Sequence, residues 1–333
     1  MKRDPNVPDF VYDYADLASP RIGTEAVLAS DEFFAAKERI LQEGPAVFIP
    51  EKYDEHGKWM DGWETRRRRG TGNDWCLFKL GVTGIVKGVD IDTSHFTGNY
   101  PPAASLEGLY SETRPAPDAR WRPLVRTTAL NGNAHHYLSV TDLDPVNWLK
   151  LQIYPDGGVA RLRVHGIPKK EWSASEREGE VELSALKHGG RIISYNDAHY
   201  GNVSALLSEG RARNMGDGWE TRRRREPGND WIIIALGAPG AISRIEVDTA
   251  HFKGNYPDRC SLQAARIDQG THQSLVTQSM FWDELLAPQK LEADKVHTFG
   301  DELVRKLGPI SHVRFNIFPD GGVSRLRLFG TLA

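Results

Sequence analysis

The chain has 333 residues, a length that suits two domains, and its net charge is −3. That charge does not favour nucleic-acid binding, which needs a basic surface, and two cysteines exclude a disulfide scaffold and a cysteine-rich metal site. The N-terminal stretch lacks the apolar core of a signal peptide, and no apolar run is long enough to span a membrane. We therefore expect a cytoplasmic protein with no membrane partner.

The first half of the chain contains few helical signals and several strand signals. Residues 31–41 (DEFFAAKERIL) are a candidate helix. The apolar run 75–81 (WCLFKLG) is rich in strand formers, and residues 84–96 (GIVKGVDIDTSHF) alternate apolar and polar side chains. Residues 148–166 (WLKLQIYPDGGVARLRVHG) predict strand, turn and strand, because proline presets φ and glycine accepts positive φ in the turn.

The second half repeats these signals. Residues 61–75 (DGWETRRRRGTGNDW) match 217–231 (DGWETRRRREPGNDW) at 13 of 15 positions, and 154–166 match 318–330 at 9 of 13. A second candidate helix lies at 205–209, and a helical turn is expected near 182–187. The first set of repeated strings ends near residue 168. The chain is therefore predicted to contain a first jelly-roll repeat at 1–168, a linker at 169–189 and a second jelly-roll repeat at 190–333.

The strand signals predict an all-β fold. Short strands joined by glycine- and proline-rich turns, occurring twice, indicate a tandem duplication of a β-sandwich of jelly-roll type. The polar residues that both copies share are expected at strand ends. Such positions lie in the loops with which a sandwich binds its ligands.

Each copy of the repeated string contains four consecutive arginines. Acidic residues flank each run and neutralise much of its charge, so nucleic acid is not expected as a partner. In an extended segment, alternation would send Arg66 and Arg68 to one side and Arg67 and Arg69 to the other. A buried arginine needs a carboxylate partner, and arginine also binds a ligand carboxylate with a bidentate fork. Both a structural network of arginines and carboxylates and an anion-binding site fit these residues.

A histidine follows the alternating strand in each repeat. His95 lies three residues after Asp92 and four before Asn99, and His251 has equivalent neighbours. A histidine oriented by a carboxylate suits acid–base chemistry near neutral pH, although a lone histidine is more often a hydrogen-bonded structural residue. Histidine and carboxylate oxygens would also suit a divalent metal. Since neither HxH nor HExxH spacing occurs, we assign no metal ligand. No cofactor is assigned, and a divalent metal stays an alternative.

The strings GWETRRRR and GNDW, present twice, together with DTSHFTGNYP, DTAHFKGNYP and the PDGGV turns, resemble those of the allantoicase (allantoate amidinohydrolase) family. The resemblance covers essentially the whole chain. It implies a duplicated jelly roll similar to galactose-binding domains. It also implies a hydrolase activity in purine catabolism, the allantoin degradation route, in which allantoate and water give ureidoglycolate and urea.

The shared residues can be given roles in that reaction. Urea departs only if it is protonated, and water must be activated by a base, so we predict the catalytic pair Glu64 and His95, or Glu220 and His251 in the second copy. The substrate carboxylate calls for arginine, and the ureido groups call for carboxylate and amide side chains. The predicted substrate-binding residues are Arg66, Arg68, Asn73, Asp74 and Asn99 and, in the second repeat, Arg222, Arg224, Asn229, Asp230 and Asn255.

The sequence leaves some alternatives open. It does not indicate which repeat is active, whether the site lies between the repeats, or whether the chain forms a homo-oligomer. The main functional alternative is a non-catalytic jelly roll that binds carbohydrate or another small ligand. Acids, arginines and histidines outnumber exposed-looking aromatic residues in the shared strings, which favours an enzyme.

Overall fold

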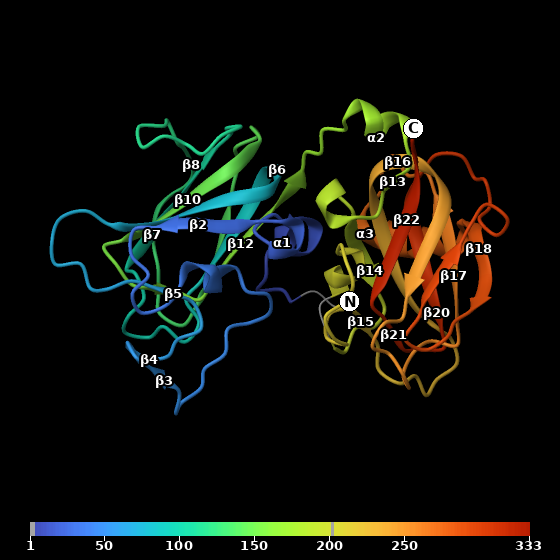
Figure 1. The fold of residues 1–333 in the computed structure, drawn as a ribbon, viewed down its shortest axis with the longest axis horizontal. Helices are drawn as coiled ribbons and strands as arrows, with labels where there is room; N and C mark the ends of the chain where they lie inside the picture. Colours follow the sequence, from blue (N-terminus) through green and yellow to red (C-terminus); the bar gives the residue numbers. More distant parts are fainter. Residues whose placement is uncertain (1–3, 201–202) are drawn as a thin grey trace. The chain divides into compact units, whose positions relative to one another are not determined.

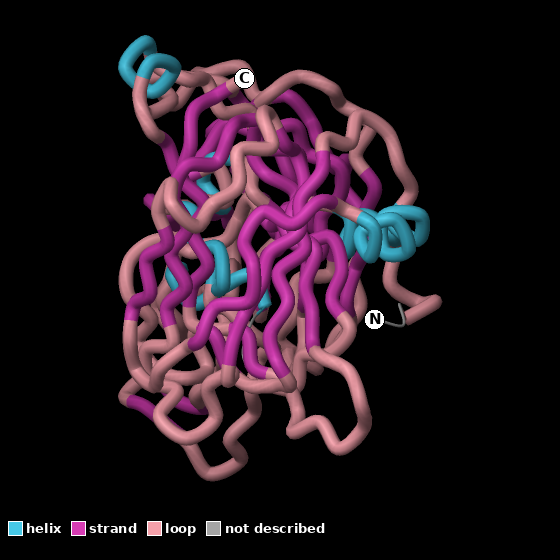
Figure 2. The backbone as a smooth tube through the Cα atoms, turned by 90° about the vertical axis from the view of Figure 1, so that its right-hand side faces the viewer, coloured by secondary structure: helices cyan, strands magenta, loops and turns pink. Residues whose placement is uncertain are grey.

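The computed structural model describes residues 4–200 and 203–333 (Figure 1). The chain divides into two compact units, Asp4–Lys169 and Lys170–Ala333. Strand and loop dominate the backbone, and the helices are short (Figure 2). In the part of the chain that is described, we find no helix of the length and apolar character that crossing a membrane requires.

The first unit is built around one long strand, β6 (Asp74–Asp92). Its N-terminal part pairs with β2 and β10, and its C-terminal part pairs with β9 and β12, so the same strand belongs to both layers of the sandwich. The other strands of the same sheet are β1 (Ala15–Asp16), β2 (Glu25–Ala29), β7 (Ala103–Leu109), β8 (Arg122–Ala129), β9 (His135–Ser139), β10 (Val146–Tyr154) and β12 (Arg161–Pro168).

Glycines make the change of layer within β6 possible. A Cβ atom on Gly81 would lie 1.8 Å from the carbonyl oxygen of Ile22, so no other residue fits where the strand passes the preceding loop. The second unit has the same device, since a Cβ atom on Gly237 would lie 2.0 Å from the carbonyl oxygen of His188. The repeated glycine after each apolar run therefore marks a close backbone approach.

Short elements complete the first unit at one end of the sandwich. Strand β5 (Trp63–Glu64) pairs with β11 (Gly158–Val159), which places the end of the repeated DGWE string beside the Pro-Asp-Gly-Gly turn. A hairpin of β3 (Tyr53–Asp54) and β4 (Gly57–Lys58) lies just before it in the chain. The helical elements are α1 (Asp9–Asp13), η1 (Pro20–Ile22) and η2 (Lys37–Leu41).

The second unit repeats this arrangement around β16 (Asp230–Asp248), which pairs with β14, β20, β19 and β22. Its strands are β13 (Val181–Glu182), β14 (Arg191–Tyr195), β15 (Trp219–Glu220), β17 (Arg259–Ala265), β18 (Asp283–Lys290), β19 (Val296–Phe299), β20 (Ile310–Phe318), β21 (Gly322–Val323) and β22 (Arg325–Leu332). Its helical elements are α2 (Ala174–Glu178), η3 (Leu186–His188), η4 (Val203–Leu207), α3 (His272–Gln278) and η5 (Ser279–Phe281).

The core of each unit follows the alternation in its long strand. In β6 the side chains of Phe78, Val89 and Ile91 are buried, and in β16 those of Ile245 and Val247 are buried. Both tryptophans of the DGWE strings are fully buried: Trp63 donates its ring N–H to the carbonyl oxygen of Asp31, and Trp219 donates to that of Asp197. These rings anchor β5 and β15 to the sandwich and are not available to stack on a ligand.

The prediction of a duplicated all-β jelly-roll sandwich is confirmed. The helix predicted over 31–41 is wrong, because only Lys37–Leu41 forms a 3-10 turn while Ala35 pairs with the edge of β5. The helix predicted at 205–209 is replaced by the 3-10 turn Val203–Leu207. Within the segment expected as a linker, β13 pairs with β22 and thus extends the second sandwich.

Candidate active site

The loop after β6 holds His95 and Asn99 in a fixed conformation. His95 has a positive φ of 69°, which is unusual for a residue other than glycine, and its backbone N–H donates to the side-chain oxygen of Asn133. Four residues later, the carbonyl oxygen of Asn99 accepts a 2.7 Å hydrogen bond from the N–H of Gly158. The loop is therefore fastened both to the segment before β9 and to the turn that carries β11.

This fastening brings Asn99 to the acid predicted as catalytic. The side-chain amide of Asn99 donates a 2.7 Å hydrogen bond to the carboxylate of Glu64. Glu64 is itself fixed at the backbone, since its N–H and carbonyl both bond to Ala35 and β5 pairs with β11. Three segments far apart in the sequence thus meet at Glu64, two of them at its backbone and the Asn99 loop at its carboxylate.

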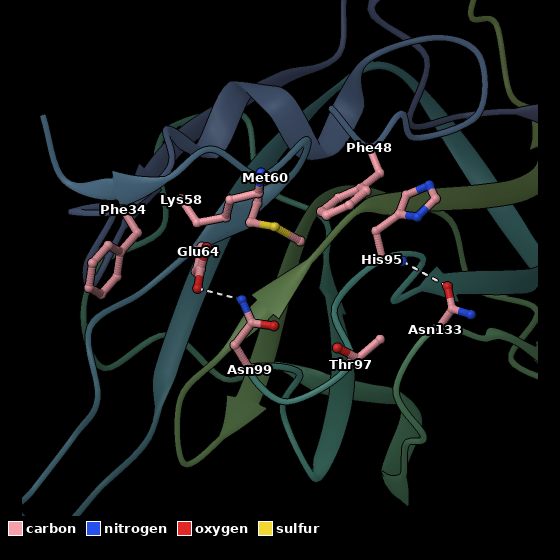
Figure 3. Close-up of a pocket in the computed structure, with 9 residues that line it drawn as sticks. All are labelled: Phe34, Phe48, Lys58, Met60, Glu64, His95, Thr97, Asn99 and Asn133. Atoms are coloured by element: carbon pink, nitrogen blue, oxygen red, sulfur yellow. Dashed lines mark hydrogen bonds between the residues drawn. The ribbon is translucent and has the colours of Figure 1, made fainter. Parts of the chain in front are cut away.

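Glu64, His95 and Asn99 open onto one cavity of about 560 Å³. In Figure 3, Glu64 and Asn99 face each other, and His95 lies across the cavity beside Phe48. The volume is in the range of sites that hold small molecules. The lining consists of Phe34, Phe48, Lys58, Met60, Glu64, His95, Thr97, Asn99 and Asn133.

The surroundings of Glu64 shift its pKa upward. Burial raises the pKa of Glu64 above its ordinary value, the hydrogen bond from Asn99 lowers it in part, and the negative charge of Asp54 raises it further. The net direction is upward. Such a carboxyl group keeps its proton closer to neutral pH than an exposed glutamate does, which suits a general acid.

His95 is held in one tautomer. Its Nε2 lies 3.1 Å from the carbonyl oxygen of Ala46, and because a carbonyl can only accept, Nε2 carries the proton in the neutral ring. That assignment leaves Nδ1 without a proton and able to act as a base. The ring is also stacked on Phe48, with centroids 5.8 Å apart and planes inclined by 24°.

The second repeat reproduces the three polar residues. Asn255 donates to the carboxylate of Glu220 at 2.5 Å, and Nε2 of His251 lies 2.8 Å from the carbonyl oxygen of Ala212. His251 also has a positive φ, of 70°, and its N–H donates to Asp294, as that of His95 does to an asparagine.

The two repeats differ in the loop that covers these residues. Ala46 and Asp61 are 15 positions apart, whereas the equivalent Ala212 and Asp217 are 5 apart, so the first repeat carries ten extra residues. Those residues form the hairpin of β3 and β4 and supply Phe48, Lys58 and Met60 to the cavity.

Comparison with known proteins supplies the family. The allantoicase repeat matches this chain twice, at residues 15–169 and 181–333. The chain belongs to the allantoicase family. It is 58% identical to a probable allantoicase of Burkholderia mallei, over 99% of this chain and 98% of the relative. A probable allantoicase of Ralstonia nicotianae is also 58% identical, over 99% and 98%.

A solved structure agrees with this assignment. The crystal structure of allantoicase from Saccharomyces cerevisiae superimposes with a TM-score of 0.80 at 34% sequence identity, covering 95% of this chain and 92% of that one. The sequence-based assignment to the allantoicase family is confirmed, and with it the prediction that the chain is a hydrolase of that class.

In this allantoicase-family chain the repeated arginines bind carboxylates of the protein itself. Arg66 contacts Asp31 through Nε at 2.7 Å, and Arg68 contacts the buried Asp74 at 2.5 Å. The backbone N–H of Arg68 also donates to Asp156. In the second repeat Arg222 pairs with Asp197, and Arg224 pairs with Asp230, in the same manner.

The predicted binding residues Asn73 and Asn229 lie next to this network. Asn73 donates to the carbonyl oxygen of Asp74 at 3.0 Å and to the side chain of Gln152 at 3.3 Å, and Asn229 donates likewise to Asp230 and Asn316. Of the residues predicted in the first repeat, Glu64, His95 and Asn99 line the cavity. Its lining does not include Arg66, Arg68, Asn73 or Asp74.

Sequence reasoning missed the cavity residues of the longer loop between Ala46 and Asp61. Phe48, Lys58 and Met60 line the cavity but occur in one repeat alone, so a search for strings shared by the two copies passes over them. The signal that could have found them is the ten-residue difference in loop length between two otherwise equivalent segments. Across residues 4–200 and 203–333, no group of three or more histidine, cysteine or acidic side chains is arranged to hold a metal ion.

Proposed function

We propose that this chain hydrolyses allantoate to ureidoglycolate and urea and that the reaction takes place in the first-repeat cavity. The observation that carries the proposal is that a half-buried, hydrogen-bonded Glu64 and His95 line the same cavity. Membership of the allantoicase family supplies the reaction, and the cavity supplies an acid, a base and amide groups for it.

The substrate suits the polar groups of the lining. Allantoate has one carboxylate and two ureido groups on a single carbon. The ureido N–H groups need acceptors, which the side-chain oxygens of Asn99 and Glu64 offer, and the ureido carbonyls need donors such as a protonated carboxyl group. Apolar contacts with Phe34, Phe48 and Met60 exclude water around these bonds.

The chemistry begins with departure of urea. The carboxyl group of Glu64 gives its proton to the leaving ureido nitrogen, which also takes the electron pair of the breaking carbon–nitrogen bond. The lone pair of the remaining ureido nitrogen moves onto the central carbon and forms a carbon–nitrogen double bond. This acid assistance is needed because a deprotonated urea is a poor leaving group.

Addition of water completes the reaction. Water attacks the central carbon, the electrons of the double bond return to nitrogen, and the released proton goes to Nδ1 of His95 or to the carboxylate of Glu64. Transfer of that proton to Glu64 restores the starting state. The products are ureidoglycolate and urea, and one water is consumed.

The equivalent residues of the second repeat allow a matched test. We expect Glu64→Gln to lower kcat by at least about 100-fold, because it removes the transferable proton while keeping the side-chain size. Glu220→Gln, which alters the matching carboxylate at a site without the hairpin, is expected to keep most of the activity. Urea release from allantoate by the purified chain is the measurement.

The outcomes separate the alternatives. Full activity of Glu64→Gln together with loss in Glu220→Gln would move the reaction to the second repeat, to the pair Glu220 and His251. Absence of urea release from the unaltered chain, with and without added divalent metal, would contradict the proposed function and leave ligand binding without chemistry.

A further inference from the structure

The cavity contains a cation that no carboxylate neutralises. Lys58 lies at the end of β4, is half-buried, and lines the cavity together with Glu64 and His95. Among the described residues, no acidic side chain forms an ion pair with Lys58. Two backbone carbonyls position its ammonium group instead: that of Ile49, at 2.9 Å from Nζ, and that of Pro50.

Aromatic rings contribute to the placement of this group. The Nζ atom of Lys58 lies 4.9 Å from the ring centroid of Phe48 and 4.7 Å from that of Tyr53. Phe48 is the ring that stacks on His95, so one aromatic side chain contacts both the cation and the base of the cavity. The hairpin therefore fixes Lys58 relative to His95.

The ammonium group has donor capacity to spare. A protonated lysine has three N–H donors, and the two carbonyls use two of them. The third donor and the full positive charge are available to an anion. By contrast, Arg66 and Arg68, the first-repeat arginines predicted to bind the substrate, already have Asp31 and Asp74 as partners.

We propose that Lys58 binds the carboxylate of the substrate and that the hairpin of β3 and β4 is the element that selects an anionic substrate. This inference rests on the function proposed above. It gives a partner to the carboxylate of allantoate, the one group of the substrate that has none in that proposal. With the carboxylate at Lys58, the ureido groups on the same carbon are directed toward Glu64 and Asn99.

Binding measurements test the assignment without relying on turnover. In a Glu64→Gln background, in which turnover is expected to be at least about 100-fold slower, titration calorimetry gives the dissociation constants of allantoate and of its uncharged primary amide. Replacing Lys58 by methionine is expected to weaken allantoate binding about 10- to 100-fold, the usual range for loss of a charge-assisted hydrogen bond, and to leave amide binding unchanged. Lys58→Arg is expected to restore most of the allantoate affinity.

Kinetics provide a second readout. With Glu64 intact, Lys58→Met is expected to raise KM for allantoate about 10- to 100-fold while kcat changes by a few-fold at most. Lys52→Met is the matched control, since Lys52 directly precedes β3, contacts the ring of Trp59 at 3.6 Å and does not line the cavity. This control is expected to bind allantoate like the unaltered chain.

Two results would overturn the inference. Unchanged allantoate binding in Lys58→Met would show that the carboxylate lies elsewhere. Equal weakening of allantoate and amide would show that Lys58 only supports the hairpin. Neither result affects the proposed function, which depends on urea release by the unaltered chain.

Discussion

The side-chain amide of Asn99 donates a hydrogen bond to the carboxylate of Glu64 at 2.7 Å, inside the cavity of the first repeat. The bond joins the loop after β6 to β5, and it opposes the effect of burial on the pKa of Glu64. The same pair occurs in the second repeat as Asn255 and Glu220. The duplication thus offers an internal control for each test of the site.

Removing this hydrogen bond should change the pH dependence of the reaction. A donor to a carboxylate stabilises the charged form, so Asn99→Leu is expected to raise the pKa of Glu64 above its already raised value. With Glu64 as the general acid, activity falls as pH rises through that pKa, and the alkaline limb of the kcat/KM profile is therefore expected to move to higher pH. We also expect kcat to fall about tenfold through loss of orientation.

The profile of kcat/KM against pH for Asn99→Leu and Asn255→Leu provides the check. Asn255→Leu removes the equivalent bond in the second repeat and is expected to leave the profile in place. A shift of the limb to lower pH in Asn99→Leu, or equal shifts in both variants, would contradict the role of Glu64 as the acid.

The pair of Arg68 and Asp74 should matter for stability. The side chain of Asp74 is 2% exposed and that of Arg68 is 31% exposed, so Arg68→Met leaves a buried carboxylate without its cation. We expect a loss of roughly 2–3 kcal/mol in the free energy of unfolding, less than for a fully buried pair because water reaches the arginine. Denaturant titration measures this loss.

A neighbouring arginine is the control. Arg69 is exposed and is expected to tolerate replacement by methionine within about 0.5 kcal/mol. For folded Arg68→Met, kcat/KM is expected to stay within a few-fold of the unaltered chain. A stable Arg68→Met variant with strongly raised KM would instead support the sequence-based hypothesis that Arg68 binds substrate.

Replacing the glycine after each Pro-Asp-Gly turn should destabilise the fold. A Cβ atom on Gly158 would lie 2.0 Å from the ring of the buried Phe96, and the N–H of Gly158 holds the Asn99 loop. Gly158→Ala is expected to destabilise the fold by about 1–3 kcal/mol and to lower kcat in the molecules that remain folded, because the ring and the loop must move.

Gly322 gives the comparison, since a Cβ atom there would lie 2.0 Å from the ring of Phe252. Gly322→Ala is expected to cost a similar amount of stability, measured as a fall in Tm, but to keep kcat near that of the unaltered chain. Equal loss of kcat in the two variants would indicate that both repeats take part in the reaction.

Much of the fold follows from local sequence signals. Residues 84–92 form a strand, as their alternation predicts, with Val89 and Ile91 in the core, although Asp90 and Asp92 between and after them are buried too. The glycines after each apolar run mark a close approach of the backbone. The helix predicted at 31–41 does not form because this segment makes contacts with a distant part of the chain instead. Ala35 pairs with Glu64, and the carboxylate of Asp31 accepts hydrogen bonds from Arg66. The helix propensity of a segment carries no information about contacts with residues distant in the sequence.

The sequence by itself determined the duplication, the all-β class, the family, and the residues shared by the two copies, because identical strings impose the same local strands and turns twice. Only the tertiary structure decided which of these residues meet. It placed Glu64, Asn99 and His95 around one cavity. It also paired Arg66 and Arg68 with Asp31 and Asp74 of the same chain. It also added Lys58 from a hairpin that is not repeated, since contacts between distant segments depend on packing rather than on local pattern.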